Sequence, residues 1–595
     1  MRNCCLLVLI LVLLTPHFTH SASLLDEVPP DALLCASFRN SSHIYETVES
    51  LTRKRGGEAH VTDPLEDRIA GFLSRWEKSL GMSLEDLVSI FSGEGIFYVT
   101  RLDFPDSHRM VFDSNIILKT GGNDKRAQEA VERFFQNVPK GAVRRSYRYM
   151  GAKVRTVRYY DKKKHSIPGA VKSDGESLPV YRETSRFFQY ALLDGCLFLA
   201  EGKGEPILRM LKNHKHRHAG SLPSKRSFQQ VFQFKGSPYD VRCFADLEGI
   251  VNQCEGFARS RGRDLEALNL EEFKALGVDL EIERDLVRIG IALLAPSPRS
   301  GAASAFFQFG PTSLLPLRFI PKDALAFSCS HFDIYPAYTT LRTSLGAVYP
   351  DIVESFRQTL AANSMVLGMD LERELIGELK GEMGYYLRES EQSPDGIAEV
   401  YFSQIAHPDL FQERLKRVFV LLYRMLNIEM RPYKHRSLVY WGPAPIGPGA
   451  GEDYTPPFGL FYRDGYLFFS MNTSELKELI ERMQSPGASS MAGHPPLLEF
   501  LEKHTSQNLA GVKLFKRGSY GLFARNLFAL KPVWEKEGVF QGVLAPESLE
   551  KPVSLGEKTT LVYQTDNLLY SITEMPLVRA GTRNPGSQTS TGGNP

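Results

Sequence analysis

Apolar and polar positions follow the same order twice along this chain. Val28 to Leu33 and Ile320 to Leu325 each contain an apolar residue, a proline, an aspartate and the start of an apolar run. Proline fixes φ and aspartate can cap a turn, so each stretch predicts the first strand of a module. Further paired stretches follow in the same order, which indicates one α+β module that has been duplicated.

The paired stretches predict hairpins and amphipathic helices. An Asp-Gly pair, at Asp194 and again at Asp464, separates two apolar runs, which is a strong hairpin signal. Helices with an acidic start and apolar residues at helical spacing are expected from Asp124 and from His407. One face of each helix must cover a sheet. The expected fold class is therefore α+β: a tandem duplication of a two-layer module, with a mostly antiparallel sheet covered by amphipathic helices.

Other segments extend this match between the copies. The first copy is longer around Asp161 to Gly175, where a polar stretch predicts an inserted surface loop. Each copy ends in strand-like runs. The matched segments are 44–45 with 334–335, 80–85 with 367–372, 93–98 with 381–386, 115–119 with 399–405, and 287–294 and 305–309 with 560–564 and 568–572.

These matches divide the chain into two modules between a leader and a tail. Residues 24–310 form the first module, 311–577 the second, and the Gly-, Ser- and Thr-rich residues 578–595 a disordered tail. Residues 1–23 are expected to be a cleavable signal peptide, because Arg2 precedes a short apolar run and small residues follow from Ser21. An uncleaved membrane anchor stays open as the alternative. We expect an exported protein, periplasmic or extracellular and at most peripheral to the membrane, with no transmembrane span after cleavage.

Composition narrows the picture only slightly. With 43% hydrophobic residues, 24% charged residues and a net charge of +2, the chain is globular and has no overall bias towards nucleic acid. Two of the seven cysteines lie in the signal peptide, and the odd number that remains argues against a disulfide framework. Only Cys243 with Cys254 could form a local bridge.

The sequence lacks the common signatures of catalysis. It contains no Gly-x-Ser-x-Gly, no His-Glu-x-x-His, no phosphate-cradling Gly-Lys-Ser/Thr loop and no Cys-x-x-Cys. We therefore expect no catalytic residue and no cofactor. His214, His216 and His218 could converge on a metal in an extended segment, but Lys215 and Arg217 between them would repel a cation. A solvated loop is the preferred interpretation.

The segment from Lys140 to Lys164 is strongly basic and carries interleaved tyrosines. Such a surface could hold polyanions by ionic contacts and ring stacking. However, Lys153 to Arg158 nearly alternates between charged and apolar residues, as the solvated side of an amphipathic strand does. The second copy keeps a weaker version between Arg431 and Trp441. The candidate anion-binding residues are Arg144, Arg145, Arg148, Lys153, Arg155 and Arg158.

Two pairs of carboxylates recur at matching positions in the copies. Asp31 with Asp323, and Glu94 with Glu382, would suit acid–base chemistry if each pair met in space. Duplication alone explains their recurrence, so no catalytic role is assigned to them.

The exported N-terminus, the duplicated Pro-x-Asp-Ala opening at Pro29 and Pro321 and the Asp-Gly hairpins resemble an uncharacterised family of large bacterial envelope proteins, classed as a domain of unknown function. The resemblance spans most of residues 24–577 and implies export and architecture, with no functional position. We expect an exported, non-enzymatic binding or scaffold protein of the bacterial envelope. Two alternatives stay open: a hydrolase of unknown class with a site between the modules, and a binder of anionic envelope polymers or lipid headgroups.

Overall fold

The structure is a computed structural model. It describes residues 24–39, 90, 93–106, 109–136, 142–171, 177–216, 220–232, 239–259, 266–283, 286–393, 396–445, 454–484, 490–504, 508–516 and 557–576. The expected signal peptide and tail, the first-copy segments 44–45 and 80–85, and His218 lie outside these residues.

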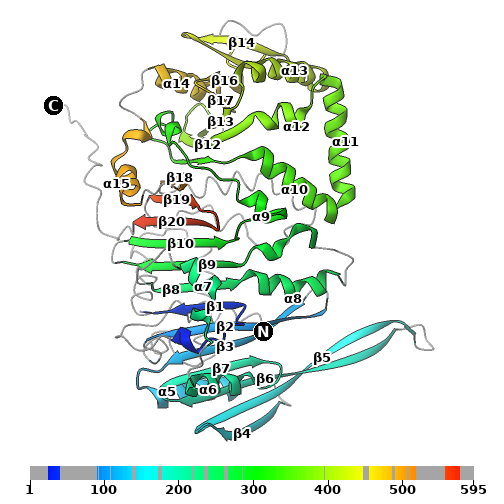
Figure 1. The fold of residues 1–595 in the computed structure, drawn as a ribbon, viewed down its shortest axis with the longest axis vertical. Coiled ribbons are helices and arrows are strands. Elements are labelled where there is room, and N and C mark those ends of the chain that lie inside the picture. The colour runs from blue at the N-terminus through cyan, green and yellow to red at the C-terminus, as the bar shows by residue number, and fades with distance from the viewer. Residues whose placement is uncertain are drawn as a thin grey trace, which may run out of the picture.

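The strands of the described residues form one open sheet of twenty strands, in which every pairing is antiparallel (Figure 1). The first half of the sheet starts at an outer edge and ends at the middle. Its strands are, in spatial order, β4 (Val143–Tyr149), β5 (Ala152–Val171), β6 (Ser177–Leu193), β7 (Cys196–Gly202), β3 (Arg109–Lys119), β2 (Gly95–Asp106), β1 (Leu34–Phe38), β8 (Val241–Asp246), β9 (Ala275–Ile282) and β10 (Leu286–Leu294).

The second half of the sheet has its strands in the same spatial order. From the other outer edge they are β14 (Met430–His435), β15 (Leu438–Pro443), β16 (Gly459–Arg463), β17 (Tyr466–Ser470), β13 (Ile397–Ile405), β12 (Leu379–Glu389), β11 (Ala326–His331), β18 (Leu509–Phe515), β19 (Lys558–Gln564) and β20 (Leu568–Pro576). The predicted α+β class and the mostly antiparallel sheet are confirmed.

The two halves meet where β10 pairs with β20. Gly290 lies opposite Ile572, and the ladder runs evenly to Leu294 opposite Leu568 on one side. Gly290 and Ile572 stand at the same distance from the centres of their hairpins, β9–β10 and β19–β20. Each of these strands therefore meets its own counterpart, and an approximate twofold axis passes through the middle of this ladder.

Helices cover both faces of the sheet. On β7, Phe198 points to the core that contains Ile207, whereas its neighbour Leu197 points to the core that contains Val131. Each half therefore has helices above and below the strands, and the expected two-layer arrangement is too simple, because β7 is apolar on both sides. The helices are α5 (Asp124–Gln136), α6 (Pro206–His216), α7 (Arg226–Phe232), α8 (Leu247–Arg259), α9 (Gly301–Phe306), α10 (Ile334–Val348), α11 (Pro350–Leu367), α12 (Leu371–Glu374), α13 (Pro408–Leu426), α14 (Thr473–Gln484) and α15 (Pro495–His504).

Two local predictions were wrong. The polar stretch from Asp161 is not a loop, because β5 continues to Val171 and pairs with β6, with one shift of register after Ser166. The two strands form an arm that projects from the sheet (Figure 1). Residues 305–309 were expected to be a strand, but most of this run belongs to the end of α9 and the turn after it. No helix within the described ranges is long and apolar enough to cross a bilayer. Cys243 and Cys254 are both free.

A buried charge cluster sits beside the junction of the halves. Glu574 of β20 accepts hydrogen bonds from Arg288 of β10 at 2.9 Å and from Lys503 at 3.0 Å, and His504 lies 3.2 Å away. Arg288 also pairs with Glu281 and with Glu283. Burial alone would raise the pKa of Glu574, but the bonds from His504, Arg288 and Lys503 lower it to about 2. The cluster therefore favours the ionised carboxylate.

We expect Glu574→Gln to lower the melting temperature at pH 7 and to reduce its dependence on acid. A carboxylate whose pKa is depressed by folding stabilises the protein above its unfolded pKa of about 4.3, and this contribution is lost as the pH falls towards 2. Thermal unfolding at several pH values between 7 and 2 measures both effects. Glu283→Gln is the control, since Glu283 lies 3.3 Å from Arg288 but its side chain is 50% exposed. Equal acid sensitivity of the wild type and Glu574→Gln would contradict the assignment.

Candidate anion-binding site

The basic segment forms a hairpin at one outer edge of the sheet (Figure 1). β4 and β5 are joined by a two-residue turn, Met150-Gly151, and both residues have positive φ, at 51° and 87°. This conformation matches the right-handed twist of the strands. Tyr149 and Ala152 flank the turn, so the register of the whole hairpin is fixed from this point.

Strand alternation sorts the six candidate residues into two sets. Arg148 lies opposite Lys153, and Arg155 lies opposite Ser146, so these side chains share one face of the hairpin. The other face contains Arg145 and Arg158. The set that shares a face comprises Arg144, Arg148, Lys153 and Arg155. The sequence predicted that the charged residues from Lys153 to Arg158 lie on the solvated face of a strand. The register is consistent with this, because Lys153 is exposed while Val154, between Lys153 and Arg155, is buried.

A hollow of about 440 Å³ opens between this hairpin and α5. Arg145 also borders it, although alternation turns that side chain to the other face. The hollow is lined by Glu132, Arg144, Arg145, Ser146, Lys153, Arg155, Thr156, Val157 and Tyr190. Four of these residues are cationic and one is anionic, so the hollow carries net positive charge.

The single acid of the lining holds one of the cations in place. Glu132 of α5 lies 2.7 Å from the Arg155 guanidinium and accepts a longer hydrogen bond, 3.4 Å, from the Tyr190 hydroxyl. The hydrogen bond from Gln128 and the charge of Arg155 keep the pKa of Glu132 below its ordinary value. The Arg155 guanidinium also lies 5.7 Å from the centre of the Tyr190 ring. Arg155 is therefore fixed. The other cations of the lining, Arg144, Arg145 and Lys153, are exposed and form the rim of the hollow.

The matching place in the second half carries different residues. The β14–β15 hairpin also turns over two residues, so positions can be counted from the turn, and Trp441 corresponds to Arg155. Trp441 packs against Phe419 of α13 with ring centres 5.2 Å apart. Met430 and Val439 stand where the first hairpin has Arg144 and Lys153. At these three positions the second hairpin has apolar residues where the first has cations.

Most of the remaining cations of the second hairpin are paired with acids, while Lys434 is exposed. Arg431 lies 2.9 Å from Glu429, while His435 and Arg436 both contact Glu481. The weaker basic version expected in the second copy is therefore largely neutralised.

The histidine candidates do not converge. His214 and His216 lie on α6, where residues two apart point in different directions. His214 Nδ1 lies 3.0 Å from Glu27, and this hydrogen bond raises the pKa of His214. Among the described residues no group of three potential metal ligands occurs. His214 fastens the N-terminal segment to α6.

The recurring carboxylates do not meet. β1, which follows Asp31, and β11, which follows Asp323, are seven strand spacings apart in the sheet, or about 34 Å. Glu382 is buried and accepts bonds from Ser313, Thr312 and Tyr466. These bonds outweigh its burial and lower the pKa of Glu382, so it serves to hold the segment between the halves.

A polar hollow of about 270 Å³ lies at the junction of the halves, where a binding groove was expected. Its only cation, among the lining residues, is Arg299, which donates to the Ala295 carbonyl at 2.7 Å and stacks 4.0 Å from the centre of the Phe307 ring. Burial lowers the pKa of Arg299. Because this guanidinium is already engaged by its own chain, the junction hollow offers less to a ligand than the hairpin hollow does.

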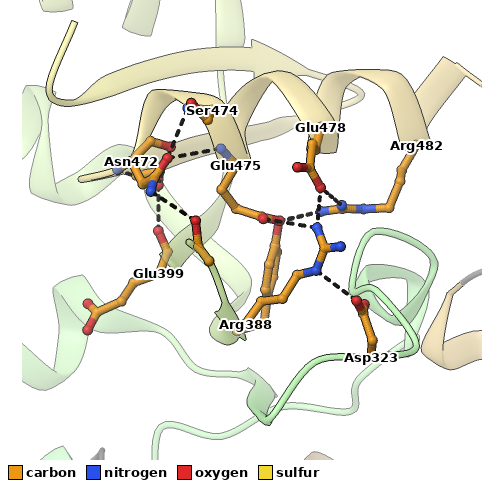
Figure 2. Close-up of polar contacts among 11 residues, drawn as sticks. Asp323, Arg388, Glu399, Asn472, Ser474, Glu475, Glu478 and Arg482 are labelled. Atoms are coloured by element: carbon orange, nitrogen blue, oxygen red, sulfur yellow. Dashed lines mark hydrogen bonds and ion pairs between the residues drawn. The ribbon is translucent and has the colours of Figure 1, made fainter. Parts of the chain in front are cut away.

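A second charge network lies under the first turns of α14 (Figure 2). Arg388 of β12 pairs with Asp323 at 2.8 Å and with Glu475 at 3.2 Å, and Arg482 pairs with Glu475 at 2.7 Å. Asn472 caps the helix by accepting from the Glu475 amide at 3.2 Å. The Glu475 side chain is only 2% exposed, so a ligand cannot reach it. The network fastens the Asp323 turn to the helix layer, as Arg209 of α6 does for Asp31 at the other end.

Sequence reasoning missed Glu132 and Tyr190 as members of the site. Tyr190 reaches the hollow because it lies opposite Arg155 in the β5–β6 ladder. The strand register supplies that information, and no short motif marks either residue.

Comparison with known proteins adds little. No protein-family model and no curated protein match the chain. Among solved structures, crystal form III of TP0453 aligns with 46% of this chain and 84% of that chain at 12% identity and a TM-score of 0.23. Crystal form I of TP0453 covers 46% and 83% at 13% identity, also with a TM-score of 0.23. Superpositions of this quality establish neither a shared fold nor a shared function.

We expect Glu475→Gln to reduce the free energy of unfolding by about 3 kcal/mol, because it removes the one buried carboxylate that Arg388 and Arg482 share. Denaturant unfolding measures the loss. Glu478→Gln is the matched control: Glu478 pairs with the same arginines, but its side chain is 51% exposed, so a loss below about 1 kcal/mol is expected. Similar losses for both variants would show that burial does not decide the strength of this network.

Proposed function

We propose that this protein is an exported, non-enzymatic binding protein of the bacterial envelope that holds an anionic partner in the hollow between α5 and the β4–β5 hairpin. The observation that carries the proposal is the contrast between the two hairpins. One end of the sheet has Arg155 and Lys153 where the other has Trp441 and Val439. Since the fold is satisfied by apolar residues at these positions, the cations are best explained by a ligand.

Electrostatics favours an anion with several charged groups. The rim cations are solvated, so each contact with a phosphate, sulfate or carboxylate contributes modestly and is weakened by salt. A linear polyanion makes several such contacts and releases counterions as it binds. The hollow is large enough for a pair of such groups.

We also infer that the two halves arose by duplication of one module, within an envelope family like the one that the sequence resembles. Three observations support this inference: the repeated Pro-x-Asp-Ala openings, the same spatial order of strands in both halves, and a junction where counterpart residues Gly290 and Ile572 face each other. The apolar run and small residues before Leu24 support export.

Neutralising the rim should weaken polyanion binding. We expect the triple variant Arg144→Gln, Arg145→Gln and Lys153→Gln to bind a heparin oligosaccharide or lipopolysaccharide at least about tenfold more weakly at 0.15 M salt. The slope of log affinity against log salt should fall by about 2, since each lost contact removes slightly less than one unit. Fluorescence anisotropy over a salt series measures both quantities.

The matched control removes three exposed cations from the other end of the sheet, as Lys416→Gln, Arg431→Gln and Lys434→Gln. It changes the net charge equally and should alter binding by less than about twofold. If the two triple variants lose the same affinity, the protein attracts anions only through its overall charge, and the proposed site is wrong.

Removing the one acid of the lining should strengthen binding. We expect Glu132→Gln to raise the affinity for the same oligosaccharide about threefold, because Arg155 is released from its 2.7 Å ion pair and its charge becomes available. Glu129→Gln, an exposed acid on the same helix that does not line the hollow, is the control. Unchanged or weaker binding by Glu132→Gln alone would mean that the anion does not enter the hollow.

A further inference from the structure

The outermost strand of the first half ends the sheet with backbone groups on its outer side. Within the described part of the chain, β4 pairs only with β5. Such an edge is a template onto which another extended segment can add by main-chain hydrogen bonds. The residues of β4 whose backbone groups face outwards determine which kind of strand can be added.

The turn decides which backbone groups face outwards. In a hairpin with a two-residue loop, the residues that flank the loop form a hydrogen-bonded pair, and pairs with and without hydrogen bonds then alternate along the ladder. Tyr149 and Ala152 flank Met150-Gly151, so Tyr149, Tyr147 and Arg145 bond inwards to β5. The outward N–H and C=O groups of β4 therefore belong to Arg144, Ser146 and Arg148.

The other edge of the sheet is closed at the matching position. β14 is also followed by a two-residue turn, which His435 flanks. Pro432 lies three residues before His435. Ser146 is three residues before Tyr149, so Pro432 is its counterpart. Proline has no N–H and is tolerated on an edge strand where that group would face solvent. β14 cannot donate a hydrogen bond at the place where β4 can.

The side chains around Ser146 set the charge of a suitable partner. Arg148 and Arg144 flank Ser146 on the face of the hairpin that borders the hollow. A residue of an added strand that lies directly opposite each of them would point to the same face. Exposed arginines on an edge discourage pairing with neutral or basic strands, but they favour a strand with acidic side chains at alternate positions.

We propose that the outer edge of β4 binds an extended acidic polypeptide segment as an added antiparallel strand, with alternate carboxylates directed towards the basic hollow. The inference rests on the proposed function and deepens it, because it names the anionic partner as a polypeptide that is held by backbone as well as by charge. β4 spans Val143–Tyr149, which limits the added strand to a similar length.

Methylated peptides separate backbone pairing from charge on the wild-type protein. The probe is a labelled acetyl-(Glu-Thr)₄-amide peptide, whose glutamates would lie opposite Arg144, Ser146 and Arg148. N-methylation of the glutamates removes the donors that face β4, whereas N-methylation of the threonines removes donors that face away and is the matched control. We expect the first change to weaken binding about fivefold more than the second.

Ser146→Pro repeats the test on the protein. It imports the residue found at the counterpart position of β14, leaves every charge in place and interrupts no bond to β5. We expect it to weaken binding of the parent peptide about fivefold more than Ser146→Ala, which removes the same hydroxyl but keeps the backbone N–H. Circular dichroism confirms that the variant is folded.

The outcomes distinguish the two proposals. If both methylated peptides bind equally, or if the peptide does not bind while heparin does, β4 does not accept a strand, and only this further inference is overturned. If neither the peptide nor heparin binds to the wild-type protein, the proposed function fails as well. Preferential binding to vesicles of anionic lipid that Ser146→Pro leaves unchanged would assign the hollow to headgroups and would also overturn the inference.

Discussion

The pairing of β10 with β20 is the interaction on which the rest of the molecule depends. It joins two arrays of strands that otherwise contact each other little into one hydrogen-bonded sheet, and it buries two edges that would otherwise be open to other chains. Because Gly290 faces its counterpart Ile572, the register is the one that gives both halves the same environment at the junction. A shift of this pairing by one residue would turn the apolar side chains of one strand from the core to solvent.

An approximately symmetric scaffold has two corresponding outer ends, and these ends are chemically different. At one end Trp441 fills the space between hairpin and helix, and the nearby cations are paired with Glu429 and Glu481. At the other end Arg155 replaces the indole and needs Glu132 to hold it. Apolar packing at one end satisfies the fold. The cations at the other end are therefore not explained by the needs of the fold.

Local patterns predicted the elements, and long-range pairing decided the rest. Asp194 and Asp464 marked real turns, since both have positive φ before a glycine, and the acidic helix starts at Asp124 and Pro408 are confirmed. The arm after Asp161 was missed because its polar residues suggest a loop, while its pairing with β6 is visible only once the sheet is assembled. For the same reason the basic residues were found as a set, but Tyr190 and Glu132, which complete the hollow, were not.

The two edge strands of the sheet are protected in different ways. A sheet of this length must leave two edges, and each must resist random pairing with other chains. β14 does so with Pro432, which removes one donor whatever the charge of an approaching strand. β4 does so with arginines, which exclude neutral and basic strands by charge but leave Ser146 able to donate. Protection by charge depends on the approaching strand, whereas protection by proline does not. Of the two edges, the one with arginines can therefore resist neutral and basic strands and still accept an acidic one.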